Sequence, residues 1–357
     1  IDVHQNHVQQ EVAFHLKACL CAVHHSPFPV AHLAFLRRQA DHVHETPIAV
    51  HCAFCTGLFV DTLLRAVFHH ARQTVDQVPQ NHKACGQHHS STCKQRANFS
   101  MNIIYKTLFD IRFSAVTQQE AVQAILQWAR ETGRPKRVVT PNVNLTLLQK
   151  RNPEFRNILN QSSLCLVDGK PIYWASRLFK VGLPEVVTGS DLVPAVFSAH
   201  HNSNSDETLT VFLLGAGAGV AERAAQRIMA SYPSVQITGV YSPPFGFEHD
   251  ALECEKICRQ IKASQASLLV IGLGAPKQEF WADRHLEKTG AKVAICAGAT
   301  IDFLAGEKSR APKWMNQLGL EWLHRTWTEP RRLGKRYLQD GLALPGLFWS
   351  EFRKNKS

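Results

Sequence analysis

The first hundred residues of this 357-residue chain contain no methionine, and the whole chain contains only three. The first of these is Met101, and regular strand and helix patterns begin after it. Residues 1–100 hold 14 of the 19 histidines and 6 of the 10 cysteines, with weak periodicity. We therefore expect residues 1–100 to be a spurious or disordered extension, and translation to start at Met101.

Two alternatives for this extension stay open. The pair Cys52-x-x-Cys55, with Cys85, Cys93 and many histidines, suggests a zinc module. A convincing zinc site needs a second pair at regular spacing, which Cys85 and Cys93 do not supply. The other alternative is a genuine helical extension. The four cysteines after Met101 lie mostly in apolar runs, where buried free thiols are the plain expectation.

The chain also lacks a long hydrophobic run. A spanning helix needs about 18 or more apolar residues, and the most apolar early stretch, residues 49–68, is interrupted by His51, Asp61 and Arg65. The N-terminus does not show the basic, apolar and small-residue order of a signal peptide. We expect a cytoplasmic protein that is at most peripheral on the inner face of the plasma membrane.

Acidic residues are fewer than basic ones, and the net charge of +11 favours an anionic partner. Residues 308–357 carry eleven Lys and Arg against four acidic residues, together with four of the seven tryptophans. This composition fits a solvated basic helix, but it is also typical of a segment at a phospholipid interface. We expect residues 307–357 to form a helical, basic, membrane-proximal appendage.

Strand and helix patterns alternate between these two regions, which predicts an α/β fold. Short apolar runs predict strands at 137–140, 164–167, 210–214, 235–240, 268–271 and 293–296. Helical periodicity predicts helices that include 118–132, 220–232, 252–264 and 277–288. Such alternation indicates a Rossmann-like, mostly parallel sheet with helices on both faces, here over residues 101–306. Ligands of such sheets bind beyond the carboxyl ends of the strands.

Two polar motifs follow predicted strands. Thr140-Pro-Asn142-Val-Asn144 opens a helix, with Thr140 as its expected cap, and its amides could bind sugar hydroxyls. Asp168-Gly169 directly follows a buried strand, where desolvation raises the pKa of a carboxyl group and suits it to act as a general base. An ordinary helix start and an ordinary Asp-Gly turn are the alternatives.

Two glycine-rich motifs follow later strands. Gly215-Ala-Gly-Ala-Gly219 resembles a dinucleotide-binding turn, but Val220 occupies the place of the third glycine. Gly272-Leu-Gly274-Ala-Pro precedes Lys277 and Gln278, which would lie in the first turn of a helix. A cation and an amide at a helix N-terminus suit a phosphate or sugar.

Taken in order, these stretches resemble the WecG/TagA/CpsF glycosyltransferase family, from about residue 101 to residue 337. The matching segments are Thr-Pro-Asn-Val-Asn at 140–144, Val-Asp-Gly at 167–169, Thr-Gly-Ser-Asp-Leu at 188–192, Gly-Leu-Gly-Ala-Pro-Lys-Gln-Glu at 272–279, Arg-Ala-Pro-Lys-Trp at 310–314, Gly-Leu-Glu-Trp-Leu-His-Arg at 319–325 and Glu-Pro-Arg-Arg at 329–332.

The resemblance implies an inverting glycosyltransferase of cell-surface polysaccharide biosynthesis. It would move a hexosyl unit, N-acetylmannosamine-like or related, from a UDP-sugar to an undecaprenyl-diphosphate-linked sugar without a metal cofactor. Asp168 would be the general base, and Thr140, the second expected catalytic residue, would lie in the pocket beside it. The appendage would close the site at the membrane, with self-association off the membrane left open. The expected substrate-binding residues are Asn142, Asn144, Gly169, Asp191, Gly272, Gly274, Lys277, Gln278, Arg325, Arg331, Arg332 and Arg336.

Two other functions stay open on the residues alone. The turn Gly215–Gly219 allows an NAD(P)-dependent oxidoreductase, against which the broken fingerprint argues. The positive charge allows a nucleic-acid-binding protein, but the basic residues concentrate in the tail beside tryptophans. We expect no nucleic-acid partner.

Overall fold

The computed structural model describes residues 102–203, 207–312, 315 and 321–355, with only the backbone of residues 330–332. All of these residues fall in one compact unit within residues 73–357. The extension 1–100, with its zinc-module and helical alternatives, lies outside the described residues. Within the described ranges, no helix combines the length and apolar character that crossing a bilayer requires.

Six parallel strands form the central sheet, in the order β4-β3-β8-β7-β5-β6. They are β3 (Lys136–Val139), β4 (Leu164–Cys165), β5 (Leu209–Gly215), β6 (Val235–Tyr241), β7 (Leu268–Gly272) and β8 (Val293–Cys296). Each predicted strand overlaps one of them, so the predicted α/β class with a parallel sheet is confirmed.

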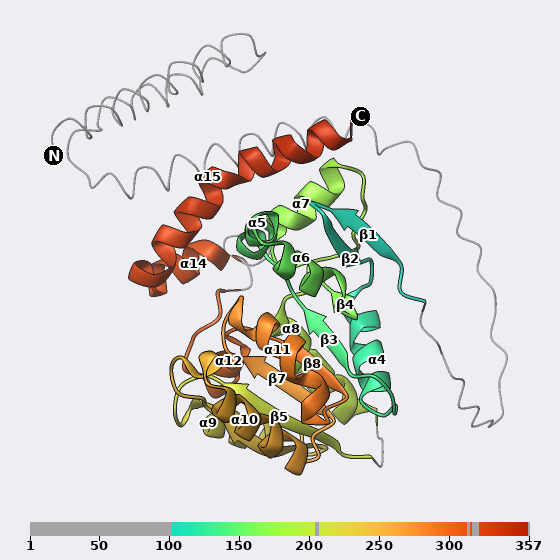
Figure 1. Cartoon of the computed structure of the whole chain (residues 1–357), viewed down its shortest axis with the longest axis vertical. Helices are drawn as coiled ribbons and strands as arrows, with labels where there is room; N and C mark the ends of the chain where they lie inside the picture. Colours follow the sequence, from blue (N-terminus) through green and yellow to red (C-terminus); the bar gives the residue numbers. More distant parts are fainter. Residues whose placement is uncertain (1–101, 204–206, 313–314, 316–320, 356–357) are drawn as a thin grey trace, which may run out of the picture. The chain divides into compact units, whose positions relative to one another are not determined.

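Helices cover both faces of the sheet (Figure 1). Successive side chains of a strand point to opposite faces, so in β7 Leu268 and Val270 join one buried cluster, whereas Leu269 and Ile271 join the other. The first cluster lies under α4 (Gln118–Trp128), α8 (Gly189–Asn202), α9 (Val220–Ser231) and α12 (Thr300–Ala305). The second lies under α5 (Val143–Arg151), α6 (Pro153–Asn160), α7 (Lys170–Leu178), α10 (Ala251–Ala263) and α11 (Lys277–Thr289).

A small hairpin, β1 (Tyr105–Leu108) and β2 (Ile111–Ser114), precedes the sheet. Its two turn residues, Phe109 and Asp110, have φ angles of 54° and 65°. The Phe109 ring is fully buried and lies 5.8 Å from the ring of Phe348. The hairpin turn is therefore covered by the C-terminal part of the chain.

The C-terminal part contains α14 (Glu321–Thr328) and α15 (Pro330–Lys354). Leu347 of α15 belongs to the buried cluster under α5, and Lys150 of α5 donates a hydrogen bond to Ser350 at 3.1 Å. The helical character expected of the appendage is thus confirmed, and α15 packs on the α/β core. The boundary expected at residue 306 stays a prediction.

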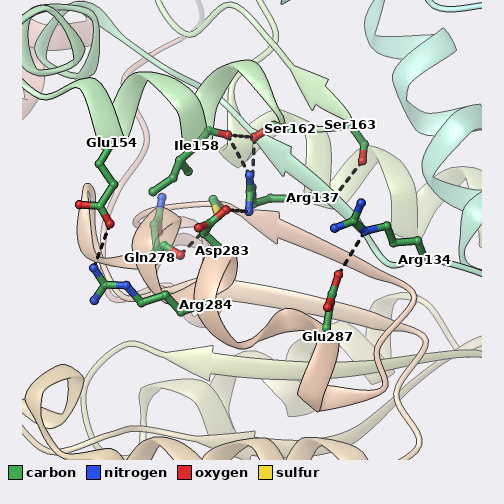
Figure 2. A network of polar contacts seen from close by, with 11 residues as sticks. Arg134, Arg137, Glu154, Ile158, Ser162, Ser163, Gln278, Asp283, Arg284 and Glu287 are labelled. Carbon is green, nitrogen blue, oxygen red and sulfur yellow. Dashed lines mark hydrogen bonds and ion pairs between the residues drawn. The ribbon is translucent and has the colours of Figure 1, made fainter.

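A polar network ties β3 to α6 and α11 (Figure 2). The Arg137 guanidinium donates to Asp283 at 2.6 Å, to the Ile158 carbonyl oxygen at 2.9 Å and to Ser162 at 3.1 Å. Beside it, Arg284 pairs with Glu154 at 3.2 Å. The Arg137 contacts fix α11, whose first turn reaches the carboxyl edge of the sheet.

Two smaller expectations have different outcomes. Cys165, Cys254, Cys258 and Cys296 are all buried and free, as predicted. The expected cap Thr140 is wrong, because α5 begins at Val143 and its cap is Asn142, whose side chain accepts a hydrogen bond from the Leu145 amide at 3.3 Å. Thr140 is one residue after β3 and is too far from the first turn to cap it.

Candidate active site

Asp168 lies just beyond β4, at the carboxyl edge of the sheet. Burial raises the pKa of its carboxyl group from an ordinary 3.8 to about 7, against the lowering effect of the Arg325 charge. The charges of Glu321 and Asp191 raise this pKa further, and a side-chain hydrogen bond from Asn142 lowers it. A carboxyl group with a pKa near neutrality can accept a proton at physiological pH and release it again.

The loop after β3 lies beside Asp168. The backbone amide of Asp168 donates to the carbonyl oxygen of Pro141 at 3.3 Å. Asn142 caps α5 through its side-chain oxygen, which leaves its amide nitrogen for the Asp168 carboxylate. Thr140 is buried between β3 and this loop. Gly169 follows Asp168 with a φ of 99° and precedes α7.

Arg325 of α14 brings a positive charge to Asp168. It pairs with Glu321 one turn earlier at 2.5 Å, and its guanidinium lies over the Phe303 ring at 5.3 Å. Its Nε atom is buried and has no hydrogen-bond partner among the described residues. The sequence pointed to Arg325 but not to Glu321, whose charge opposes it at Asp168.

Asp191, in the first turn of α8, is held on both carboxylate oxygens. One oxygen accepts a hydrogen bond from Thr188 at 2.8 Å, and the other pairs with Arg310 at 2.5 Å. Arg310 also donates to Ser190 at 3.0 Å. Arg310 belongs to a motif noted in the sequence, but nothing in the sequence indicated its partner 119 residues away.

Asn144 faces α15. Its side-chain amide donates to Asp340 at 3.0 Å. Burial raises the pKa of Asp340, whereas Asn144 and the charge of Arg336 lower it. Arg336 has a buried Nε atom with no hydrogen-bond partner in the described part of the chain. Arg331 and Arg332 lie in the first turn of α15, and their side chains are outside the described residues.

The loop after β7 approaches the loop after β8 closely. A Cβ atom on Gly272 would lie 3.0 Å from the carbonyl oxygen of Gly298, and Gly274 has a φ of 81°. Gln278 is buried, accepts a hydrogen bond from the Gly298 amide at 3.1 Å and donates to Glu279 at 2.8 Å. Its amide therefore joins the two loops, while its role in substrate binding stays a prediction.

The first turn of α11 presents two charged groups of different environment. Lys277 pairs with Glu248 at 2.7 Å and lies over the ring of Phe245, which is fully exposed. Glu279 is fully buried, and burial raises its pKa to about 7 against the hydrogen bond from Gln278. Its second oxygen has no partner within the described ranges. Sequence reasoning did not single out Glu279.

The sheet topology gathers these loops around β8. The helices that follow its neighbours β3 and β7 cover one face of the sheet, and α12, which follows β8, covers the other. Where the helices that follow neighbouring strands cover opposite faces, their loops separate and leave a ligand-binding position at the carboxyl edge of a parallel sheet. Asn142 and Asp168 lie on one side of this position, and Gln278 lies on the other. Two cavities of about 70 and 30 Å³ lie at the opposite, amino edge and do not include Asp168.

Comparison with known proteins decides the family. The sequence model of the Glycosyl transferase WecG/TagA/CpsF family matches residues 106–357. The chain belongs to this family. It is similar to the N-acetylglucosaminyldiphosphoundecaprenol N-acetyl-beta-D-mannosaminyltransferase of Staphylococcus aureus strain MRSA252, with 28% identity over 200 residues, 56% of this chain and 74% of that protein. The protein of the same name from strain NCTC 8325 / PS 47 matches with the same identity and coverage.

The WecG/TagA/CpsF member described here is therefore a glycosyltransferase. Neither the oxidoreductase nor the nucleic-acid-binding alternative gains support from the family match. In the ranges the structure describes, no three or more His, Cys, Asp or Glu side chains are grouped as metal ligands. The expectation of metal independence stays a prediction.

Proposed function

We propose that this protein transfers an N-acetylmannosamine-like hexosyl unit from a UDP-sugar to a sugar linked to a lipid diphosphate, with inversion at the anomeric carbon. The observation that carries the proposal is Asp168, a carboxyl group with a pKa of about 7 beside Arg325 at the carboxyl edge of the sheet. The names of the staphylococcal relatives supply the sugar and acceptor classes.

In this mechanism Asp168 removes the proton of the acceptor hydroxyl. The hydroxyl oxygen forms the new bond to the anomeric carbon, and the bond between that carbon and UDP breaks, with the electron pair leaving on the diphosphate. Arg325 and Arg336, each with a buried Nε atom without a partner among the described residues, would hold the negative charge of the diphosphates. Charge-assisted hydrogen bonds of this kind need no metal ion.

The acceptor's lipid requires the enzyme to work at a membrane surface, on the cytoplasmic side where nucleotide sugars are made. Support comes from α15, on which Leu342, Trp349 and Phe352 are 64%, 58% and 43% exposed. Their spacing of seven and three residues places them on one helical face, opposite the buried Leu347. The Arg353 guanidinium lies over the Trp349 ring at 5.4 Å. Exposed aromatic and basic side chains on one face favour docking to an anionic membrane.

The test incubates the full chain with a panel of UDP-sugars and a short-chain lipid diphosphate carrying N-acetylglucosamine. The proposal expects UDP release coupled to a lipid product heavier by one hexosyl unit, with N-acetylmannosamine among the accepted sugars. Turnover should be unchanged after EDTA treatment. UDP release without a heavier lipid would contradict transfer to this acceptor, and loss of activity that only a divalent metal restores would contradict metal independence.

A further inference from the structure

Arg310 joins parts of the site that lie far apart in the sequence. It follows α12, and its guanidinium pairs with Asp191 of α8 at 2.5 Å and donates to Ser190 at 3.0 Å. Arg310 also lies over the ring of Phe303, at 5.8 Å from the ring centre. One side chain thus contacts both α8 and α12 immediately before the chain continues to α14.

The Phe303 ring is shared with Arg325. The guanidinium of Arg325 lies over it at 5.3 Å, and that of Arg310 at 5.8 Å. The face of an aromatic ring attracts a guanidinium group electrostatically and by stacking. Phe303 therefore couples the position of Arg310 to that of Arg325, whose charge acts on Asp168.

The Asp191 carboxylate, which pairs with Arg310, is held in place by the first turn of α8. Its second oxygen accepts from the Thr188 hydroxyl at 2.8 Å, and its own amide donates back to that hydroxyl at 3.1 Å. The carboxylate is thereby oriented toward Arg310 by the first turn of α8. Asp191 stays a predicted substrate-binding residue, and its contacts in the structure also make it an anchor for Arg310.

We propose that Arg310 is a positioning residue of the transfer reaction. Its contacts with Asp191 and Phe303, which we call the clasp, hold Arg325 beside Asp168 and neutralise the negative charge of Asp191. This inference rests on the proposed function. The charged groups that act on Asp168 are Arg325, Glu321 and Asp191, with Asn142 as its hydrogen-bond partner. Loss of the Arg310 charge would leave the carboxylates of Glu321 and Asp191 near Asp168, with only the Arg325 guanidinium to offset their charge.

Loss of Arg310 is expected to raise the pKa of the Asp168 carboxyl group. Without Arg310, both the unpaired Asp191 charge and a displaced Arg325 make Asp168 harder to ionise. In Arg310→Gln, the pH below which kcat declines should therefore move to higher pH. The plateau kcat should also fall, by about 10- to 100-fold, since small displacements of reacting groups have effects of this size. Arg310→Lys keeps the charge and should keep the native pH dependence.

Arg284→Gln is a matched control. Arg284 also joins an ion pair, with Glu154 at 3.2 Å, to an aromatic contact, over Phe280 at 5.5 Å, but it lies between α6 and α11 (Figure 2). Its pH dependence and plateau should match those of the native chain. Hydrogen exchange supplies a readout that does not need activity: the amides of α14, residues 321–328, should exchange faster in Arg310→Gln than in the native chain or in Arg284→Gln.

The outcomes separate this inference from the proposed function. A native chain without turnover contradicts the proposed function, and the exchange of α14 still tests the clasp. Faster exchange and a shifted pH dependence in Arg310→Gln, with Arg310→Lys close to native, support the clasp. A native chain that turns over, with Arg310→Gln indistinguishable from Arg284→Gln in both measurements, overturns it. A lower plateau with an unshifted pH dependence also overturns the assignment, since a merely structural residue would give that result.

Discussion

At the scale of single residues, the role proposed for Asp168 and the environment of its carboxyl group favour opposite protonation states. Asp168 must be ionised to accept a proton, yet its burial favours the protonated form and raises its pKa to about 7. Arg325 and Asn142 oppose that effect, and Glu321 and Asp191 add to it. The result is a base that is half ionised near neutral pH, where a general base is most effective.

This pKa predicts a dependence of stability on pH. Between pH 3.8 and about 7 the unfolded chain releases the Asp168 proton while the folded protein retains it, so folding stability falls as pH rises through this window and levels off above it. Replacement by Asn removes this charge. The melting temperature of Asp168→Asn relative to that of the native chain should therefore be higher at pH 8 than at pH 4.

Thermal unfolding followed by circular dichroism at both pH values checks this expectation. Asp250→Asn is the control, because Asp250 caps α10 and Asn caps helices about as well as Asp. A difference between Asp168→Asn and the native chain that is the same at pH 4 and pH 8 would contradict the raised pKa.

At the scale of elements, sequence reasoning succeeded where one local pattern decides the structure. The six apolar runs and four periodic segments became strands and helices because burial on a parallel sheet needs only those patterns. The β1–β2 hairpin was missed for a physical reason. Two-residue hairpin turns with positive φ favour Asn-Gly or Asp-Gly, and here Phe109-Asp110 occupies the turn, with the Phe109 ring buried against Phe348.

For the site, too, sequence reasoning succeeded where a local pattern decides the structure and failed where distant segments pair. The sequence placed the relevant loops at the carboxyl ends of strands, because that follows from α/β topology alone. It could not show that Asn144 bonds Asp340 or that Arg310 bonds Asp191, which are separated by 196 and 119 residues. Pairings of that kind depend on how the C-terminal helices pack. Helix α8 was not predicted, because Pro194 inside it removes a helical hydrogen bond.

The close approach of β5 and β7 at their carboxyl ends, where each strand continues into its loop, predicts the effect of one glycine substitution. Gly215 has a φ of 115°, and a Cβ atom there would lie 2.5 Å from the backbone carbon and oxygen of Gly272. Because the backbone atoms on both sides cannot move apart without straining the two strands, Gly215→Ala should lower the free energy of unfolding by about 1–3 kcal/mol.

Urea unfolding measures this loss, with Gly217→Ala as the matched control in the same loop. A Cβ atom on Gly217 would have Val220 Cγ2 as its nearest neighbour, at an ordinary 3.5 Å. That variant should stay within about 0.5 kcal/mol of the native chain. Equal midpoints for the two variants would show that the loops do not approach as described.

At the scale of the whole molecule, charge and apolar exposure concentrate at the C-terminal end. Residues 308–357 carry +7 of the +11 net charge, with eleven basic and four acidic residues. One face of α15 packs on the core through Leu347 and Phe348, and another exposes Leu342, Trp349 and Phe352. The first face fixes the helix on the enzyme, and the second is the surface we propose for the membrane.

Vesicle binding tests that surface. Burying an exposed leucine contributes about 1 kcal/mol when roughly half to two thirds of it leaves water, so Leu342→Ser should weaken binding to anionic vesicles about fivefold. Leu252→Ser is the control, because Leu252 is 76% exposed but lies on α10. Native binding should also weaken as salt is raised. Equal effects of the two serine variants would contradict docking through α15.

The central claim is that Asp168 is the general base, and the dependence of kcat on pH tests it most directly. For the native chain with saturating UDP-sugar and lipid acceptor, kcat should rise about tenfold per pH unit and level off above an apparent pKa near 7. Asp168→Asn should lose about 10²- to 10⁴-fold in kcat and this dependence on pH, whereas Asp250→Asn should keep both. A variant Asp168→Asn that retains native kcat, or that keeps the same rise with pH, would contradict the assignment.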